Sequence, residues 1–117
     1  MHIVNDKLGT PTYTKDFASN VKLLIEKKHY GLFNMVCGGF TGRLEVAYEL
    51  IKLLGLEESL KVKEVTSEFF AEKYFAERPE CERLVNKRLD DLGLNIMRDW
   101  RNALEAYLVD YCPNMIK

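Results

Sequence analysis

The sequence predicts an α/β domain that is mostly helical, with about three short strands. Three observations support this fold class. Apolar residues recur at the three- and four-residue spacing of an amphipathic helix in three stretches. Short runs of strand character lie between these stretches, and glycine or proline closes most of them. The order is strand, helix, strand, helix, strand and then helices, which favours some parallel pairing.

The composition limits the class of protein. The 117 residues are 47% hydrophobic and 30% charged, which suits one soluble domain with a modest core. Seventeen basic and eighteen acidic residues leave no basic excess, so nucleic acid is not an expected partner. The chain shows neither an apolar run long enough to cross a membrane nor the pattern of a secretory signal. We therefore expect a cytoplasmic protein without membrane contact.

Cysteine and histidine positions indicate neither a metal site nor a disulfide framework. The cysteines are odd in number and widely spaced, and the histidines have no partner at ligand spacing. We expect free thiols and no bound metal. The residues concerned are Cys37, Cys81, Cys112, His2 and His29.

The first stretch combines a strand end, a turn and a helix start. A short strand is predicted to end at Asn5, before a Gly-Thr-Pro-Thr turn. Gly9 permits a backbone angle that other residues avoid, and Pro11 keeps its predecessor extended. Thr14 is predicted to cap the helix, with Asp16 in its first turn. Because little chain precedes Asn5 to pair with this strand, the sequence looks like the later part of a longer protein.

The first helix is predicted over 14–29 and closes at Gly31. The segment 32–37 follows as a short strand that is apolar on both faces, so we expect it to be buried. A turn over 38–42 comes next, with Thr41 placed to cap the second helix. The apolar stripe of the first helix consists of Phe17, Val21, Leu24 and Ile25.

The second helix is predicted to end at Gly55, with Leu44, Ala47, Tyr48, Ile51 and Leu54 on one face. A strand over 60–65 alternates like one with a single buried face, and a short helix starts near Thr66. A loop over 76–80 precedes a small helix capped by Asn86 and stopped by Gly93. Its Leu89 and Leu92 are predicted to point inward.

The last helix is predicted over 100–111 and ends near Pro113. Trp100 and Tyr107 lie on its apolar face. We expect both to be core residues.

Two local motifs have a functional and a structural interpretation. Gly38, Gly39 and Gly42 lie between a strand and a helix but do not match G-x-G-x-x-G, so a tight turn is favoured over a phosphate-binding helix N-terminus. Tyr48 and Lys52 match the Tyr-x-x-x-Lys pair of short-chain dehydrogenases. That spacing also arises by chance, and Tyr48 falls on the apolar stripe, so a structural role is favoured.

Four residues are candidates for binding an anionic ligand. Arg43 sits in the first turn of the second helix, where a cation opposes the helix dipole; it suits either a diphosphate or a carboxylate such as Glu45. Arg78 precedes Pro79 in an extended loop and is either a phosphate ligand or a solvated side chain. Thr10 and Thr12 offer hydroxyls at the end of a strand, although such residues more often satisfy the turn itself.

Taken together, several segments resemble the C-terminal portion of the dTDP-4-dehydrorhamnose reductases and their relatives among the extended short-chain dehydrogenases. The similarity runs in order over nearly the whole chain and covers less than half of the family's usual length. Departures are modest; for example, Lys7 stands where glutamine is common. The matching segments are 5–18, 30–34, 43–47, Arg78-Pro79, 84–89 and 100–104.

The resemblance implies a specific activity. The family reduces the keto group of a dTDP-linked 4-keto sugar with NADH or NADPH, giving dTDP-rhamnose. Its N-terminal Rossmann part carries the cofactor turn and the Thr/Tyr/Lys catalytic set, and the later part closes over the sugar nucleotide. This chain resembles only the later part, so residues 1–117 are expected to form the substrate domain of a Rossmann-type fold. We expect it to hold no cofactor, to contain no catalytic residue and to be inactive alone; Tyr48 and Lys52 do not inherit the catalytic role.

Two other functions remain open. One is a non-enzymatic regulatory subunit, because the regulatory subunit of methionine adenosyltransferase is similar to the same part of the family. The other is a stand-alone interaction module in which the helix over 100–111 docks on a partner. In each case, exposed apolar surface on the strands 3–5 and 32–37 predicts contact with a missing Rossmann half or self-association.

Overall fold

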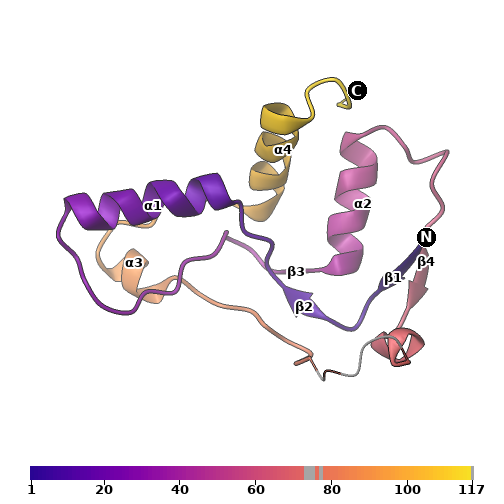
Figure 1. Ribbon diagram of the computed structural model, residues 1–117, viewed down its shortest axis with the longest axis horizontal. Coiled ribbons are helices and arrows are strands. Elements are labelled where there is room, and N and C mark those ends of the chain that lie inside the picture. Colours follow the sequence, from indigo (N-terminus) through magenta and orange to yellow (C-terminus); the bar gives the residue numbers. More distant parts are fainter. Residues whose placement is uncertain (73–75, 77, 117) are drawn as a thin grey trace.

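The computed structural model describes residues 1–72, 76 and 78–116 (Figure 1). It confirms the mixed α/β class, with helices dominating and strands of two or three residues. The predicted loop over 76–80 includes Glu77, which lies outside the described residues. The elements in chain order are β1 (His2–Val4), β2 (Leu8–Gly9), α1 (Thr14–Glu26), β3 (Thr41–Gly42), α2 (Arg43–Leu53), β4 (Lys63–Val65), the 3₁₀ helix η1 (Ser67–Phe70), α3 (Lys87–Asp91) and α4 (Trp100–Tyr111).

The strands form two separate pairs rather than one sheet. β1 and β4 are parallel, with Ile3 opposite Glu64, while β2 and β3 are antiparallel, with Leu8 opposite Gly42. The first strand, with little chain before it, finds its partner later in the chain, in β4. Gly9 lies in β2 and does not have the positive φ that was predicted for it.

The three longer helices form near the predicted positions, but their N-terminal caps differ from the prediction. Tyr13, not Thr14, is the N-cap of α1, and neither helix α1 nor α2 has a capping hydroxyl. Thr41 is held in β3, so Gly42 becomes the N-cap of α2 and its N–H donates to the Glu45 carboxylate at 2.8 Å. A hydroxyl one residue out of place cannot reach the free N–H groups of the first turn.

Helix α1 buries a polar face. Asp16, Asn20 and Leu24 are its buried residues, whereas Phe17 and Ile25 of the predicted stripe are exposed. Arg98 binds the Asp16 carboxylate at 2.8 Å. The Asn20 amide donates to the carbonyl of Leu94 and accepts from the N–H of Ile96. The loop before α4 therefore supplies partners for the Asn20 amide and for Oδ1 of Asp16, while Asp16 Oδ2 has no partner among the described residues.

The segment 32–37 was predicted to be a buried strand, and the structure corrects this. Within the described residues it pairs with no other strand, although it is extended and alternates like one. Met35 and Cys37 are buried, while Leu32 is 85% exposed. Asn86 precedes α3 as predicted, but its side chain bonds to the Val36 backbone instead of capping the helix.

Seven of the buried apolar side chains in the described residues form two clusters. Trp100 is buried, as predicted, whereas Tyr107 is 45% exposed and contacts the rings of Tyr13 and Tyr111 at the surface. Leu89 is fully buried, but Leu92, which was predicted to point inward, is exposed at the end of the single-turn α3. The clusters are Tyr13, Cys37, Trp100 and Ala103 in one, and Leu24, Met35 and Leu89 in the other.

Among the described residues, every helix is too short or too polar to cross a bilayer. That part of the chain also contains no group of three side chains placed to hold a metal ion.

Candidate functional site

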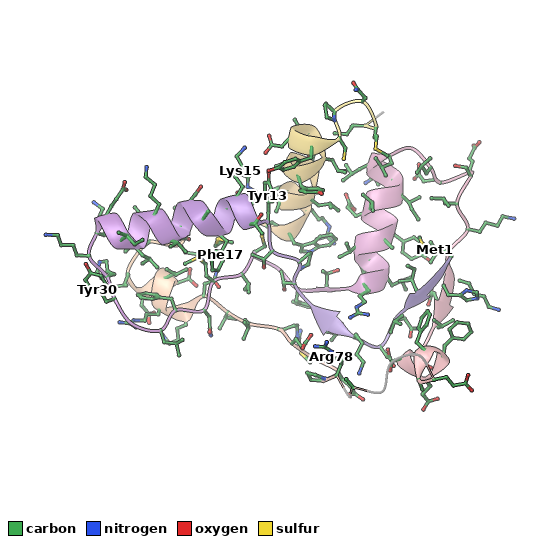
Figure 2. All side chains as sticks on the ribbon, in the orientation of Figure 1. Met1, Tyr13, Lys15, Phe17, Tyr30 and Arg78 are labelled. Carbon is green, nitrogen blue, oxygen red and sulfur yellow. The ribbon has the colours of Figure 1, made fainter. Side chains whose placement is uncertain are left out.

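Two pockets meet at a cluster of charged side chains. The smaller pocket, about 310 Å³, lies between β2, the start of α2 and the loop at Arg78 (Figure 2). The larger, about 900 Å³, lies between β1, η1 and the same loop. Both pockets are lined by Lys7, Arg43, Arg78 and Glu82, which therefore form the boundary between them. We call Lys7, Arg43 and Arg78 the cation cluster.

Backbone pairing assembles this cluster from three distant stretches. The β2–β3 pair places Arg43, the first residue of α2, next to the residues that follow Lys7. On the other side of β2, the Leu8 N–H donates to the Glu80 carbonyl at 2.8 Å and the Glu82 N–H donates to the Leu8 carbonyl at 2.9 Å. These bonds fix the Arg78 loop against β2.

Lys7 adds a side-chain bond to the same loop. Its Nζ donates to the Arg78 carbonyl at 2.8 Å. Since Lys7 also lines both pockets, its ammonium group both holds the loop and contributes positive charge to the site.

The cluster carries excess positive charge. Within the described part of the chain, none of its three cations lies within ion-pair distance of a carboxylate. The predicted alternative of an Arg43 pair with Glu45 is not found there, because the Glu45 carboxylate accepts from Gly42 instead. Among the described lining residues, the three cations face two carboxylates, Glu82 at the boundary and Glu68 in the larger pocket, and the remaining positive charge favours an anion.

The two candidate threonines have different positions. Thr10 lines the smaller pocket, and its hydroxyl donates to the Gly39 carbonyl at 3.0 Å, which leaves its oxygen free to accept. Thr12 lies away from the cation cluster, beside a separate apolar pocket against α4. Its hydroxyl accepts from the Cys37 N–H and contacts the Thr10 carbonyl. The structure thus brings Thr10, Arg43 and Arg78 together and leaves Thr12 outside.

Sequence reasoning missed two residues at the site. Lys7 was noted only as a departure from a glutamine, and Glu82 was not singled out at all. Lys7 directly precedes the Gly-Thr-Pro-Thr turn and Glu82 follows Arg78 by four positions. Their closeness to two candidate segments was the available signal, but only the folded chain shows that these segments touch.

A hydrogen bond also fixes the wall of the larger pocket. The Asp6 carboxylate accepts from the N–H of Ser67 at 3.0 Å and from its hydroxyl at 2.7 Å. The backbone hydrogen bond from Ser67, followed by the side-chain one, lowers the pKa of Asp6 below its ordinary value. The start of η1 is therefore held to the link between β1 and β2.

The glycine turn does not fit a dinucleotide. Gly39 has a φ of 80°, and a Cβ there would lie 2.8 Å from Asp99 Oδ2. The N–H of Gly42, at the start of α2, is already bound by Glu45. A pyrophosphate needs free N–H groups at such a helix start. This arrangement favours the tight-turn interpretation.

Tyr48 and Lys52 lie apart from the cation cluster. Both line a pocket between α2 and the residues that precede β4. The Tyr48 hydroxyl is 3.4 Å from a Glu64 carboxylate oxygen. Neither side chain lines either of the two pockets that meet at the cation cluster.

Comparison with known proteins gives a consistent assignment. The family model described as the RmlD substrate binding domain matches residues 1–112. The chain is 32% identical over 108 residues to the spore coat polysaccharide biosynthesis protein SpsK of Bacillus subtilis. It is 29% identical over 111 residues to a probable dTDP-4,6-dihydroxy-2-methyloxan-3-one 4-ketoreductase of Streptomyces antibioticus. Each match covers 92% of this chain but 36% of the relative.

Solved structures show the same relationship. A dTDP-4-dehydrorhamnose reductase from Clostridium acetobutylicum is 34% identical and superimposes with a TM-score of 0.86, over 93% of this chain and 38% of that one. A second such reductase, from Bacillus anthracis and solved in complex with NADP, shares the fold with a TM-score of 0.84 at 24% identity. The chain therefore spans a little over a third of the length of these proteins.

Proposed function

The chain belongs to the RmlD substrate-binding domain family, and on this basis we propose that it binds a dTDP-linked deoxysugar as the substrate-holding part of an NAD(P)H-dependent 4-ketosugar reductase. The cation cluster carries this proposal. Its three positive side chains, none of which forms an ion pair with another described residue, stand where two pockets join. A nucleotide sugar has the matching form, with a diphosphate between two groups that carry no charge.

The two pockets differ in a way that suits the two ends of such a ligand. The larger pocket is lined by Ile3, Val4 and Phe70, which offer apolar and aromatic surface to a nucleoside. The smaller one combines Leu8, Pro11 and Val46 with the Thr10 hydroxyl. Apolar walls with one polar group suit a deoxysugar, whose faces are partly apolar. We therefore propose that the nucleoside occupies the larger pocket and the sugar the smaller one.

The proposal divides the chemistry between this chain and another part of the enzyme. A reduced nicotinamide supplies the hydride that turns a keto carbon into an alcohol. The glycine turn of this chain offers no free cradle for the pyrophosphate of that cofactor. We propose that a separate nucleotide-binding part holds NADH or NADPH, that the chain has no activity alone, and that the enzyme works in the cytoplasm.

Calorimetric titration with dTDP-rhamnose tests the binding proposal. Arg78→Gln removes one cation from the cluster, and we expect affinity to fall about 10- to 100-fold, the range for a lost charge-assisted hydrogen bond. Arg83→Gln is the matched control, because Arg83 stacks on Phe40 and lines neither pocket. Its affinity should stay near that of the unmodified chain.

Two outcomes contradict the proposal. One is the absence of binding heat with the unmodified chain at any ligand concentration. The other is an equal loss of affinity in Arg78→Gln and Arg83→Gln, which points to general charge attraction rather than to this site.

A further inference from the structure

Glu82 is the carboxylate that the two pockets at the cation cluster share. It lines both the smaller and the larger pocket, whereas Glu68, the other acidic residue described in their walls, lines the larger pocket alone. The Glu82 N–H donates to the Leu8 carbonyl at 2.9 Å, and the preceding residue, Cys81, pairs with Leu8 in a parallel bridge. Glu82 therefore lies at the junction of the pockets because its main chain is held against β2.

The neighbouring cations do not neutralise this carboxylate. Among the described residues, Glu82 forms no ion pair, and neither of its carboxylate oxygens accepts a hydrogen bond. The ammonium group of Lys7, which lines the same two pockets, donates to the Arg78 carbonyl instead. The Glu82 side chain is exposed. Both of its oxygens therefore keep their capacity to accept hydrogen bonds from a ligand.

A carboxylate at this junction changes which anions the site prefers. A site built from cations alone binds the most highly charged anion best. Free dTDP has a terminal phosphate that ionises a second time near about pH 6, so at about pH 8 it carries more charge than the esterified phosphate of a dTDP-sugar. The carboxylate repels this additional charge. It can also accept a hydrogen bond from a sugar hydroxyl, a donor that a fully ionised phosphate lacks.

We propose that Glu82 is a specificity-determining residue, which favours a nucleoside diphosphate esterified to a hydroxyl-bearing sugar over the free nucleoside diphosphate. The inference rests on the proposed function, with the diphosphate at the cation cluster and the sugar in the smaller pocket. In that arrangement the terminal phosphate of free dTDP lies beside the carboxylate that otherwise meets the sugar. Arg43 and Arg78 attract either ligand, and Glu82 supplies the difference in affinity between them.

Two other glutamates provide matched controls. Glu80 belongs to the same segment beside β2 but lines neither pocket, and its bond to the Leu8 N–H uses only its main-chain carbonyl. Its substitution therefore removes a nearby charge without touching the site. Glu68 lines the larger pocket, which is proposed to hold the nucleoside of either ligand. Loss of its charge should therefore strengthen the binding of both ligands by a similar factor.

Calorimetric titrations with dTDP and with dTDP-rhamnose at about pH 8 test the proposal. The measured quantity is the ratio of the Kd for dTDP to the Kd for dTDP-rhamnose. Glu82→Gln removes the charge but keeps the length of the side chain and one acceptor oxygen. We expect this ratio to fall about fivefold, the effect of one exposed charge at low salt. For Glu80→Gln and Glu68→Gln the ratio should stay within about twofold of that of the unmodified chain.

The outcomes separate this inference from the proposed function. A ratio that Glu82→Gln leaves unchanged, while both ligands bind, overturns the inference and leaves the proposed function in place. An equal fall of the ratio in Glu80→Gln or Glu68→Gln also overturns it, because the effect then comes from net charge rather than from the junction. If neither ligand binds the unmodified chain, the proposed function fails and this inference fails with it.

Discussion

The ammonium group of Lys7 donates a 2.8 Å hydrogen bond to the main-chain carbonyl of Arg78, 71 positions further along the chain. One member of the cation cluster therefore positions the loop that carries another member. The charge of Lys7 and its hydrogen bond are two separate contributions to the site. Substitutions can distinguish them, since glutamine can keep the hydrogen bond without the charge.

We predict that Lys7→Gln weakens dTDP-rhamnose binding about fivefold at low salt, the effect of one lost exposed charge. The affinity should also depend less on salt than in the unmodified chain. Lys7→Met, which removes the contact with the Arg78 loop as well, should lose more affinity than Lys7→Gln. Titrations at two ionic strengths measure both effects, with Lys27→Gln as control, because Lys27 follows α1 and lines neither pocket. Equal affinities for Lys7→Gln and the unmodified chain would contradict the placement of Lys7 at the anion.

The ion pair between Asp16 and Arg98 should stabilise the fold. The Asp16 side chain is 6% exposed and that of Arg98 is 44% exposed. Arg98→Met leaves a carboxylate buried without its partner, so we expect the free energy of unfolding to fall by about 2–3 kcal/mol. Lys22→Met breaks the exposed pair with Glu26 and should cost at most about 0.5 kcal/mol. Urea unfolding measures the free-energy loss of each variant, provided that the m-values are unchanged. Equal losses for Arg98→Met and Lys22→Met would contradict the prediction.

Acid should weaken the fold through Asp6. Its pKa is lowered from 3.8 by the hydrogen bonds from Ser67, so the unfolded chain takes up a proton more readily than the folded one. This stabilisation is complete above the unfolded pKa and is lost as the pH falls through the folded one. Urea midpoints between about pH 5 and pH 2 should therefore fall less steeply for Asp6→Asn. The slope for Ser67→Ala, which keeps the N–H donor, should lie between those of Asp6→Asn and the unmodified chain. Identical slopes for all three proteins would show that Asp6 contributes nothing to this pH dependence.

The helices were predictable because their signals are local. Apolar spacing along residues 14–26, 43–53 and 100–111 needs no knowledge of the rest of the chain. The polar face of α1 was not predictable, because Asp16 and Asn20 can be buried only when the loop at 94–98 supplies their partners. The prediction that Thr41 caps the second helix was wrong for a similar reason, because the β2–β3 pair holds Thr41 in a strand.

The candidate site was partly predictable. Arg43, Arg78 and Thr10 were chosen for their local chemistry, and the structure brings them to one pocket, where their role as ligands remains a proposal. Thr12 has the same local chemistry but faces the backbone of Cys37. Which way each threonine turns depends on the segment packed beside it, and the sequence gives no sign of that contact.

The side chains of Asn86 and Arg88 have one more consequence, which concerns aggregation. An uncharged extended run such as 30–37 is a template on which further strands could add without limit. Fibril growth needs both edges of each strand, and here one edge is blocked by an amide and a guanidinium. The side chains of Asn86 and Arg88 therefore hinder the addition of further strands at that edge of the segment.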